Sequence, residues 1–306
     1  MSGKNVTEVR LADAAGIAEA ARILESGGLV AVPTETVYGL AARADSAEAV
    51  ARIYAAKGRP DFNPLIVHVT GLAQGELYAE FSPQARALAA AHWPGPLTLV
   101  LPRRADAGLA EAVTAGLPTL ALRAPAHPAM RAVLESVDFP LAAPSANRSG
   151  FISPTCAEHV LASLDGRIDL VLDAGPTSAG VESTIVAVRA DGSVEELRPG
   201  PIQLGTRSGV RGGIEAPGQL ASHYAPGKPV RLNATTAAAD EFWIGFGPWA
   251  GEVTLSASGD VAEAAARLYA CLHHAARAPQ PRIAVAPVPE EGVGRAVNDR
   301  LRRAAA

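Results

Sequence analysis

The sequence predicts an α/β protein with two domains joined by a linker. It has 306 residues, of which 48% are hydrophobic and 19% charged, a composition typical of compact α/β proteins. Short apolar runs alternate with segments of helical periodicity on both sides of a stretch rich in glycine, proline and serine. We therefore expect a first domain over residues 1–205, a linker over 206–228 and a small Rossmann-like domain with a parallel sheet over 229–306.

Charge and cysteine content exclude several classes of protein. The net charge of −4 and isoelectric point near 6.0 argue against a protein that coats nucleic acid. Cys156 and Cys271 are the only cysteines, and no histidines form a metal-binding pair, so we expect neither a disulfide framework nor a protein-bound metal. The first residues lack a signal pattern, and no apolar run is long enough to span a bilayer. We expect a cytoplasmic protein without membrane contact.

The stretch 29–69 holds the first functional signal. Residues 29–32 form an apolar run that predicts a buried strand, and Thr34, Glu35 and Thr36 follow it directly. Ligand crevices in α/β sheets open at such strand ends. This stretch therefore predicts a binding crevice beside Thr34 and Thr36.

A helix follows, with Ser46 as its N-terminal cap and Gly58 as its left-handed end. It places Lys57 and Arg59 on either side of its last turn, just before a turn through Asn63. Two cations at a sharp turn suit a polyanionic ligand. Ordinary capping, with Lys57 complementing the helix dipole and Arg59 solvated, explains this helix equally well.

The first domain continues with further strands and helices. Serine followed by proline predicts helix starts at Ser82 and at Ser153. Polar or basic residues close many of the apolar segments: Thr34, Thr36, Lys57, Arg59, His68, Arg123, Ser145, Asn147, Ser183, Thr184 and Arg198. Cations combined with hydroxyl donors suit a substrate pair that carries phosphate and carboxylate. Because no phosphate loop of the Walker type and no nucleophile elbow are present, we expect catalysis by positioning and charge stabilisation.

Beyond the linker, short apolar runs again alternate with segments of helical periodicity. Strands are expected at 230–232, 242–246, 253–255 and 283–288, with helices at 260–277 and 293–303, which predicts a small parallel sheet. The linker contains His223 and Tyr224, although a segment that only connects two domains needs no such side chains. A linker whose aromatic ring simply docks on the nearest domain is the alternative.

Six spaced motifs resemble the YrdC-like family. They are residues 33–40 (PTETVYGL), Lys57-x-Arg59 with 63–65 (NPL), 93–98 (WPGPLT), 144–147 (PSAN), 180–184 (GVEST) and 198–200 (RPG). The match covers about residues 8–205, and 216–226 is similar to the linker of the long members of the family. The resemblance implies a twisted mixed sheet with flanking helices and a concave cavity, plus the small Rossmann-like domain. Some long members carry serine where this chain has Ala225, so no hydroxyl contact is assumed there.

The resemblance implies the activity of an L-threonylcarbamoyladenylate synthase. Such an enzyme converts L-threonine, bicarbonate and ATP to threonylcarbamoyl-AMP and diphosphate, for N6-threonylcarbamoyladenosine in tRNA. Mg²⁺ would be carried with ATP, and downstream tRNA threonylcarbamoyl-transferase proteins would accept the product, without stable nucleic-acid binding by this chain. Carried over by position, Lys57 and Arg59 would be catalytic, and His223 and Tyr224 would form a lid.

The remaining implied site residues divide between the two substrates. L-Threonine would be held by Thr36, His68, Arg123 and Ser183. ATP would be held by Arg59, Asn63, Thr119, Ser145, Asn147, Ser153 and Arg198. Without the resemblance, His68 is by default a core histidine, Ser153 a helix cap and Thr119 a strand residue.

Two alternatives stay open at this point. The first is a YrdC-like module that grips RNA through its basic residues without chemistry, although the acidic net charge opposes it. The second is another adenylating or carbamoyl-transferring enzyme on the same fold.

Overall fold

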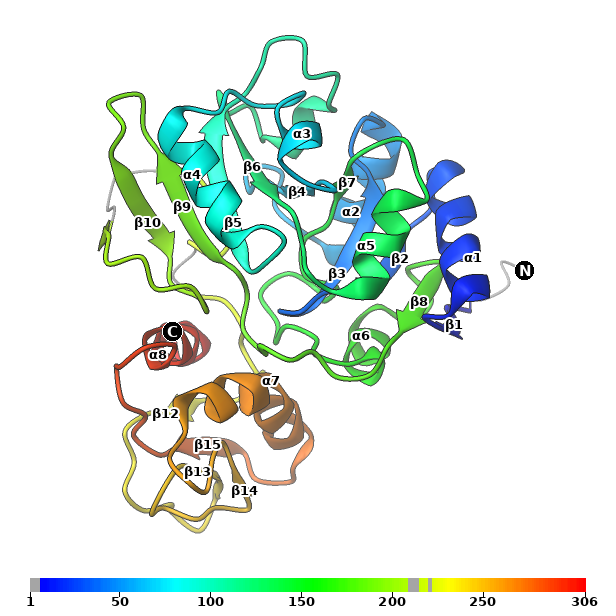
Figure 1. Cartoon of the computed structure of the whole chain (residues 1–306). Helices are drawn as coiled ribbons and strands as arrows, with labels where there is room; N and C mark the ends of the chain where they lie inside the picture. The colour runs from blue at the N-terminus through cyan, green and yellow to red at the C-terminus, as the bar shows by residue number, and fades with distance from the viewer. Residues whose placement is uncertain (1–5, 209–214, 220–221) are drawn as a thin grey trace.

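The computed structural model describes residues 6–208, 215–219 and 222–306, and its described part contains two sheets (Figure 1). The larger sheet carries the strands up to Ser208, and the smaller one carries the strands after Lys228. Both sheets have helices packed against them. The predicted α/β class is thereby confirmed.

The larger sheet is mixed, as expected. Its strands are β1 (Glu8–Leu11), β2 (Val30–Pro33), β3 (Tyr38–Arg43), β4 (Ile66–His68), β5 (Leu97–Pro102), β6 (Thr119–Arg123), β7 (Leu141–Ala142), β8 (Leu170–Asp173), β9 (Thr184–Val188), β10 (Val194–Arg198) and β11 (Arg207–Ser208). Their order is β1-β8-β2-β3-β7-β4-β6-β5-β9-β10-β11. Parallel pairs such as β4 with β6 and β5 with β9 alternate with antiparallel pairs such as β5 with β6.

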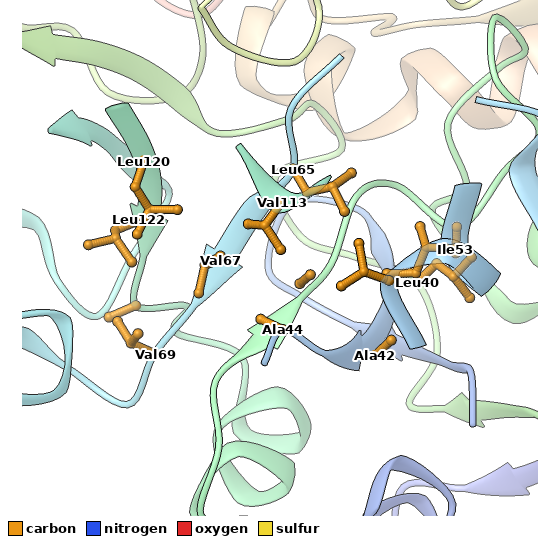
Figure 2. Packing of buried hydrophobic residues seen from close by; sticks show 14 of the residues in the cluster. Leu40, Ala42, Ala44, Ile53, Leu65, Val67, Val69, Val113, Leu120 and Leu122 are labelled. Atoms are coloured by element: carbon orange, nitrogen blue, oxygen red, sulfur yellow. The ribbon is translucent and has the colours of Figure 1, made fainter. Parts of the chain in front are cut away.

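Helices cover both faces of this sheet. They are α1 (Ala14–Glu25), α2 (Ala47–Lys57), α3 (Leu72–Gly75), α4 (Pro83–His92), the 3-10 helix η1 (Glu111–Val113), α5 (Pro128–Glu135) and α6 (Ala157–Leu164). Alternate residues of one strand enter different cores: Val30 and Val32 pack with α1 and α5, whereas Ala31 packs in the cluster that contains α2. Figure 2 shows part of the α2 cluster, with Ile53 and Leu40 among its labelled residues.

Helix α2 begins and ends where its sequence predicts. The Ser46 side chain accepts a hydrogen bond from the Ala49 amide, and Gly58 ends the helix in the left-handed region with φ 59°. Glycine adopts that conformation without a Cβ clash, so the chain turns sharply into Arg59. The local sequence therefore fixes where Lys57 and Arg59 stand.

The prediction that a helix begins at Ser153-Pro154 is wrong. Helix α6 begins at Ala157, with Cys156 as its N-terminal cap. The Ser153 hydroxyl donates instead to Glu182, and the Pro154 carbonyl accepts from the Tyr38 amide at 2.9 Å. The Ser153 hydroxyl and the Pro154 carbonyl are therefore both bound by other segments, and the helix begins only at Ala157.

The smaller sheet is parallel throughout, as predicted. It contains β12 (Val230–Arg231), β13 (Glu241–Gly245), β14 (Val253–Thr254) and β15 (Arg282–Val285), in the order β12-β15-β13-β14. Its helices are α7 (Val261–Arg277) and α8 (Gly294–Ala304). Asp260 caps α7 by accepting from the Ala262 and Glu263 amides. Figure 1 shows both helices between the small sheet and the larger sheet.

One hydrophobic core joins the two sheets' domains. Buried residues of α7, α8 and the small sheet form a cluster that also contains Val37, Ile152 and Val181 from the first part of the chain. Tyr224, from the predicted linker, belongs to the same cluster. Apolar packing therefore links the two parts of the chain.

The predicted linker contributes regular structure as well. Arg207–Ser208 extends the large sheet as β11, parallel to β10, and Ala225 bridges to Phe151. Residues 209–214, 220 and 221 of this linker lie outside the described part. None of the described helices is long and apolar enough to cross a membrane.

Candidate active site

A cavity lies where the predicted residues from distant parts of the chain converge. Its wall includes most of the residues expected to bind substrates: Thr36, Arg59, His68, Arg123, Ser145, Ser183 and Arg198. His223 and Tyr224 of the predicted lid line it too, together with Pro217 and Gly218. The sequence-based expectation that these side chains face one common hollow agrees with this geometry.

Sheet register brings two of the predicted threonine-binding residues together. Strands β4 and β6 are parallel, and His68 pairs with Arg123 at their carboxyl ends. Both strands end on these polar residues, so both side chains reach the same edge of the sheet. The strand Ile66–His68 is buried along its whole length.

Arg123 is held by two partners from the loop after β2. One guanidinium nitrogen donates to the Thr36 hydroxyl at 3.0 Å, and another lies 2.6 Å from a Glu35 carboxylate oxygen. Burial alone would raise the pKa of Glu35, but the Arg123 charge, the hydrogen bond from Arg123 and those from backbone amides together outweigh it, and the pKa is lowered. The sequence places Glu35 as a carboxylate at a strand end, and nothing in the motif pattern assigns it to the site.

Two histidines of the cavity wall are kept neutral. Burial lowers the pKa of His68 to about 3, with the Arg123 charge adding to the effect, and burial lowers that of His223 to about 3. Among the described residues, Nδ1 of each ring is buried without a hydrogen-bond partner. Unpaired buried polar atoms are rare in native proteins, so these two atoms are suited to meet polar groups of a ligand.

Arg59 faces the cavity and also stabilises the turn that follows it in the chain. It donates to the carbonyl oxygens of Asn63 at 3.1 Å and Pro64 at 2.8 Å. Burial lowers its pKa to about 10, which leaves the guanidinium charged at neutral pH. The Asn63 side chain lies outside the cavity lining, and its amide atoms are buried without partners among the described residues.

Lys57 lies behind the cavity wall. Its Nζ donates to the carbonyl oxygens of Ser145 and Asn147, both at 2.5 Å, and the side chain is buried. Burial and the neighbouring Arg59 charge lower its pKa well below the usual range. This differs from the expected free cation beside phosphates: Lys57 fixes the loop that carries Ser145, and a direct catalytic role stays a prediction.

Three other predicted ATP-binding residues also lie outside the cavity lining. The Asn147 amide donates to the carbonyl oxygens of Arg148 and Phe151 and so shapes the loop after β7. Thr119 begins β6, at the opposite end of the strand from Arg123. Ser153 is fully buried, and its hydroxyl donates to Glu182 at 2.6 Å. Direct contact of these three with a nucleotide stays a prediction.

Ser183 and Arg198 form a second cationic corner. Arg198 donates through Nε and a terminal nitrogen to the Ser183 carbonyl, at 3.1 and 3.0 Å, and to its hydroxyl at 3.1 Å. Another terminal nitrogen donates to the Pro217 carbonyl at 3.3 Å. These contacts come from β10, from the residue before β9 and from the linker, so the Arg198 position depends on all three segments.

Glu182 is a wall residue whose importance the sequence did not show. Its carboxylate accepts hydrogen bonds from Ser153, from the Tyr269 hydroxyl at 2.9 and 3.0 Å, and from Arg300 Nε at 2.8 Å. Burial opposes its charge, but Arg300 and Arg198 outweigh this and lower its pKa to about 2. It directly precedes Ser183 in the GVEST motif, yet its partners Tyr269 and Arg300 are 87 and 118 positions away.

The linker closes one side of the cavity. Tyr224 has a left-handed backbone with φ 63°, and its ring packs near Tyr269 and His223, at centroid distances of 5.6 and 4.1 Å. The His223 amide donates to the Arg303 carbonyl at 3.1 Å. His223 and Tyr224 are therefore anchored on the small domain while they face the cavity, a position compatible with the predicted lid.

The described residues contain no cluster of three or more His, Cys, Asp or Glu side chains arranged for a metal ion. The Glu182 carboxylate is already engaged by three donors, the Ser153 and Tyr269 hydroxyls and Arg300 Nε, and Arg300 balances its charge. Any metal at this cavity would have to be held chiefly by the ligand itself.

Two family models match the chain. One, described as telomere recombination and covering Sua5, YciO and YrdC proteins, matches residues 22–200. The other, described as the C-terminal domain of threonylcarbamoyl-AMP synthase, matches residues 192–306. The chain belongs to the Sua5/YciO/YrdC family. The resemblance drawn from the six motifs is confirmed.

Relatives within the Sua5/YciO/YrdC family share both parts of the chain. A threonylcarbamoyl-AMP synthase of Pyrococcus abyssi is 38% identical over 317 residues, covering 93% of this chain and 92% of that protein. A threonylcarbamoyl-AMP synthase of Bacillus subtilis is 46% identical over 230 residues, covering 71% of this chain and 66% of that protein.

A solved structure of a Sua5/YciO/YrdC family member agrees with the present fold over nearly its whole length. The crystal structure of P. abyssi Sua5 complexed with L-threonine has a TM-score of 0.88 at 35% identity, and the match covers 98% of this chain and 97% of that one. The predicted mixed sheet and small parallel domain are thus confirmed together.

Proposed function

We propose that this protein is a threonylcarbamoyl-AMP synthase that converts L-threonine, bicarbonate and ATP to threonylcarbamoyl-AMP, diphosphate and water. Support comes from its family, from the names of its relatives, and from the Sua5 complex with L-threonine. The observation that carries the proposal is the meeting of Arg59, Arg123 and Arg198 around one cavity with small hydroxyl donors. The product would serve the formation of N6-threonylcarbamoyladenosine in tRNA.

The threonine half of the cavity would lie at Thr36, His68, Arg123 and Ser183. The Arg123 guanidinium suits the substrate carboxylate, because arginine pairs with carboxylates through two parallel hydrogen bonds. Bicarbonate takes up a proton and loses water to give carbon dioxide; the neutral amine of threonine adds to this carbon dioxide, forming a carbon–nitrogen bond and releasing a proton. Neutral His68 and His223 suit this half because the unpaired ring Nδ1 of each can meet a polar group of threonine.

The nucleotide half would lie at Arg59, Ser145 and Arg198, with Asn63, Asn147, Thr119 and Ser153 around it. A carbamate oxygen attacks the α-phosphorus of ATP, and the bond from that phosphorus to the bridging oxygen breaks as diphosphate leaves. Negative charge grows on the phosphoryl group and on the leaving diphosphate. Fixed guanidinium groups lower the barrier because they are already oriented toward that charge.

Mg²⁺ fits this cavity as a companion of ATP. It would be held by phosphate oxygens and water, because the described residues hold no cluster of metal ligands and Glu182 is engaged by Ser153, Tyr269 and Arg300. Bound there, it would neutralise phosphate charge. His223 and Tyr224, anchored to the small domain, would exclude water from the labile carbamate. The product would pass to tRNA threonylcarbamoyl-transferase proteins in the cytoplasm.

The test is diphosphate release by the purified full-length protein. We expect release to require ATP, Mg²⁺, L-threonine and bicarbonate together, to stop with excess EDTA, and to need no RNA. Release that is independent of threonine would instead indicate another adenylating enzyme on the same fold. Absence of release, with salt-sensitive RNA binding, would indicate an RNA-binding module.

The RNA-binding alternative has a specific difficulty. The guanidinium groups of Arg59, Arg123 and Arg198 are buried, with 9%, 4% and 4% of their residue surface exposed. RNA phosphates are bound by exposed cations along a surface. Buried cations around a small cavity suit a nucleotide and an amino acid better.

A further inference from the structure

Glu182 connects the cavity wall to the small domain. Its carboxylate receives the Tyr269 hydroxyl from α7 and Arg300 Nε from α8, besides Ser153 from the loop before α6. We call Ser153, Glu182, Tyr269 and Arg300 the interdomain network. Arg300 and Tyr269 are fully buried, so water does not compete for these contacts.

The same residue is joined directly to the substrate side of the wall. Glu182 precedes Ser183, whose carbonyl and hydroxyl oxygens both accept from Arg198. A displacement of Glu182 therefore moves the Ser183 carbonyl and removes the acceptor that aims the Arg198 guanidinium. The path from α7 and α8 to Arg198 runs through one carboxylate and one peptide unit.

We propose that Glu182 is a positioning residue, through which the docked small domain sets the Arg198 guanidinium for ATP. This inference rests on the proposed function, since it takes ATP as the ligand of Arg198. The small domain is then part of the nucleotide site without contributing a contacting side chain from α7 or α8. Loss of one hydroxyl on α7 is enough to weaken ATP binding.

A purely structural role would have a different signature. Glu241, in β13, is also a buried carboxylate with an arginine partner, Arg231 at 2.6 Å, and its pKa is likewise lowered to about 2 by that hydrogen bond. It lies within the small domain and shares none of the contacts of the interdomain network. Glu241→Gln therefore serves as the matched control for Glu182→Gln.

The experiment measures ATP affinity by calorimetry with Mg²⁺ and the KM for ATP in diphosphate release, using full-length protein throughout. Tyr269→Phe removes one hydroxyl and keeps the ring, so it remains usable even if Glu182→Gln does not fold. We expect Tyr269→Phe to weaken ATP binding and raise its KM about tenfold, as for a lost hydrogen bond to a charged group. Glu241→Gln should lower the melting temperature and leave the KM for ATP within twofold of wild type.

A double variant distinguishes positioning from additive damage. If Tyr269 acts through Glu182, Glu182→Gln/Tyr269→Phe binds ATP no more weakly than Glu182→Gln alone. Additive losses, or a Tyr269→Phe variant with wild-type ATP affinity, would overturn this inference and leave the proposed function intact. Failure of the wild-type protein to bind ATP would overturn the proposed function itself.

Discussion

Arg123 and Glu35 form an ion pair of 2.6 Å at the wall of the cavity, although they belong to β6 and to the loop after β2. The pair orients the guanidinium while its positive charge is partly balanced. A substrate carboxylate must therefore compete with, or add to, an anion already present. That arrangement favours a ligand with a cationic or neutral polar group beside its carboxylate, as an amino acid has.

Arg123→Lys should raise the KM for L-threonine about tenfold or more. Lysine keeps the charge but cannot meet Thr36, Glu35 and a carboxylate with one planar fork, and a lost charged hydrogen bond is worth about 1.5–3 kcal/mol. Steady-state kinetics with threonine and ATP varied separately will measure this. Arg131→Lys, at an exposed pair with Glu135, is the control. Equal increases in both KM values would contradict the assignment of Arg123 to threonine.

Lys57→Met should destabilise the protein by about 2–4 kcal/mol, because two buried carbonyl oxygens lose their donor. Chemical unfolding will measure that loss. Lys228 provides a matched comparison, since its Nζ also donates to two carbonyl oxygens, of Ala275 and Ala278. Only Lys57→Met should also raise the KM for ATP, because only its carbonyl partners belong to the Ser145 loop. An unchanged KM would limit Lys57 to stability.

Gly218→Ala should impair the nucleotide site. Gly218 has φ +84°, and a Cβ there would lie 2.9 Å from Arg198 Cδ and 3.1 Å from the Tyr224 hydroxyl. Gly227 has φ +75° with nothing within 4 Å of an added Cβ, so Gly227→Ala carries the backbone strain alone. Both variants should lose about 1–2 kcal/mol of stability. Only Gly218→Ala should lower kcat/KM for ATP, by about tenfold to a hundredfold.

A stacked pair of histidines should make the interface between the domains sensitive to acid. His159 of α6 and His273 of α7 stack with centroids 3.8 Å apart, and burial lowers their pKa values to about 4 and about 3. Thr155, Glu158 and Arg277 surround His159, and the Ser153 carbonyl meets His273. The folded protein thus binds fewer protons than the unfolded chain between pH 6.5 and these values.

Stability should therefore be full above pH 6.5 and fall as the pH decreases toward 4, because protons then favour the unfolded chain. We expect each histidine to lower the free energy of unfolding by about 2 kcal/mol between pH 7 and pH 5, and the pair by up to about 4 kcal/mol. The double variant His159→Gln/His273→Gln should show a flatter profile by chemical unfolding. A profile as steep as that of the wild type would assign the acid sensitivity to other groups.

The sequence predicted the fold where local chemistry decides it. Ser46 caps the start of a helix through its side chain, and Gly58 ends it through its backbone preference. The alternation of apolar strands with helices predicts the small parallel sheet. The predicted helix start at Ser153-Pro154 was wrong, because the serine hydroxyl donates a hydrogen bond to Glu182 and the proline carbonyl accepts one from the Tyr38 amide. Those partners come from remote segments, and a local capping signal carries no information about them.

In the candidate site too, some residues are predictable from the local sequence, and others depend on remote segments. Arg59, Arg123 and Arg198 stand at the ends of strands or helices, so their positions in the sequence predict a shared crevice. Lys57 carries the same local signal, yet it turns to the carbonyl oxygens of a loop almost 90 residues away. Glu182 stands next to the predicted binding residue Ser183, but its partners Tyr269 and Arg300 follow only from the docking of the small domain.

The shared cluster that includes Val37, Ile152 and Val181 has a thermodynamic consequence. Were the small domain to melt first, these side chains would meet water, and the charge of Glu182 would be left without its strongest partner. Unfolding of either domain therefore destabilises the other. On heating, calorimetry should record one cooperative peak for the full chain.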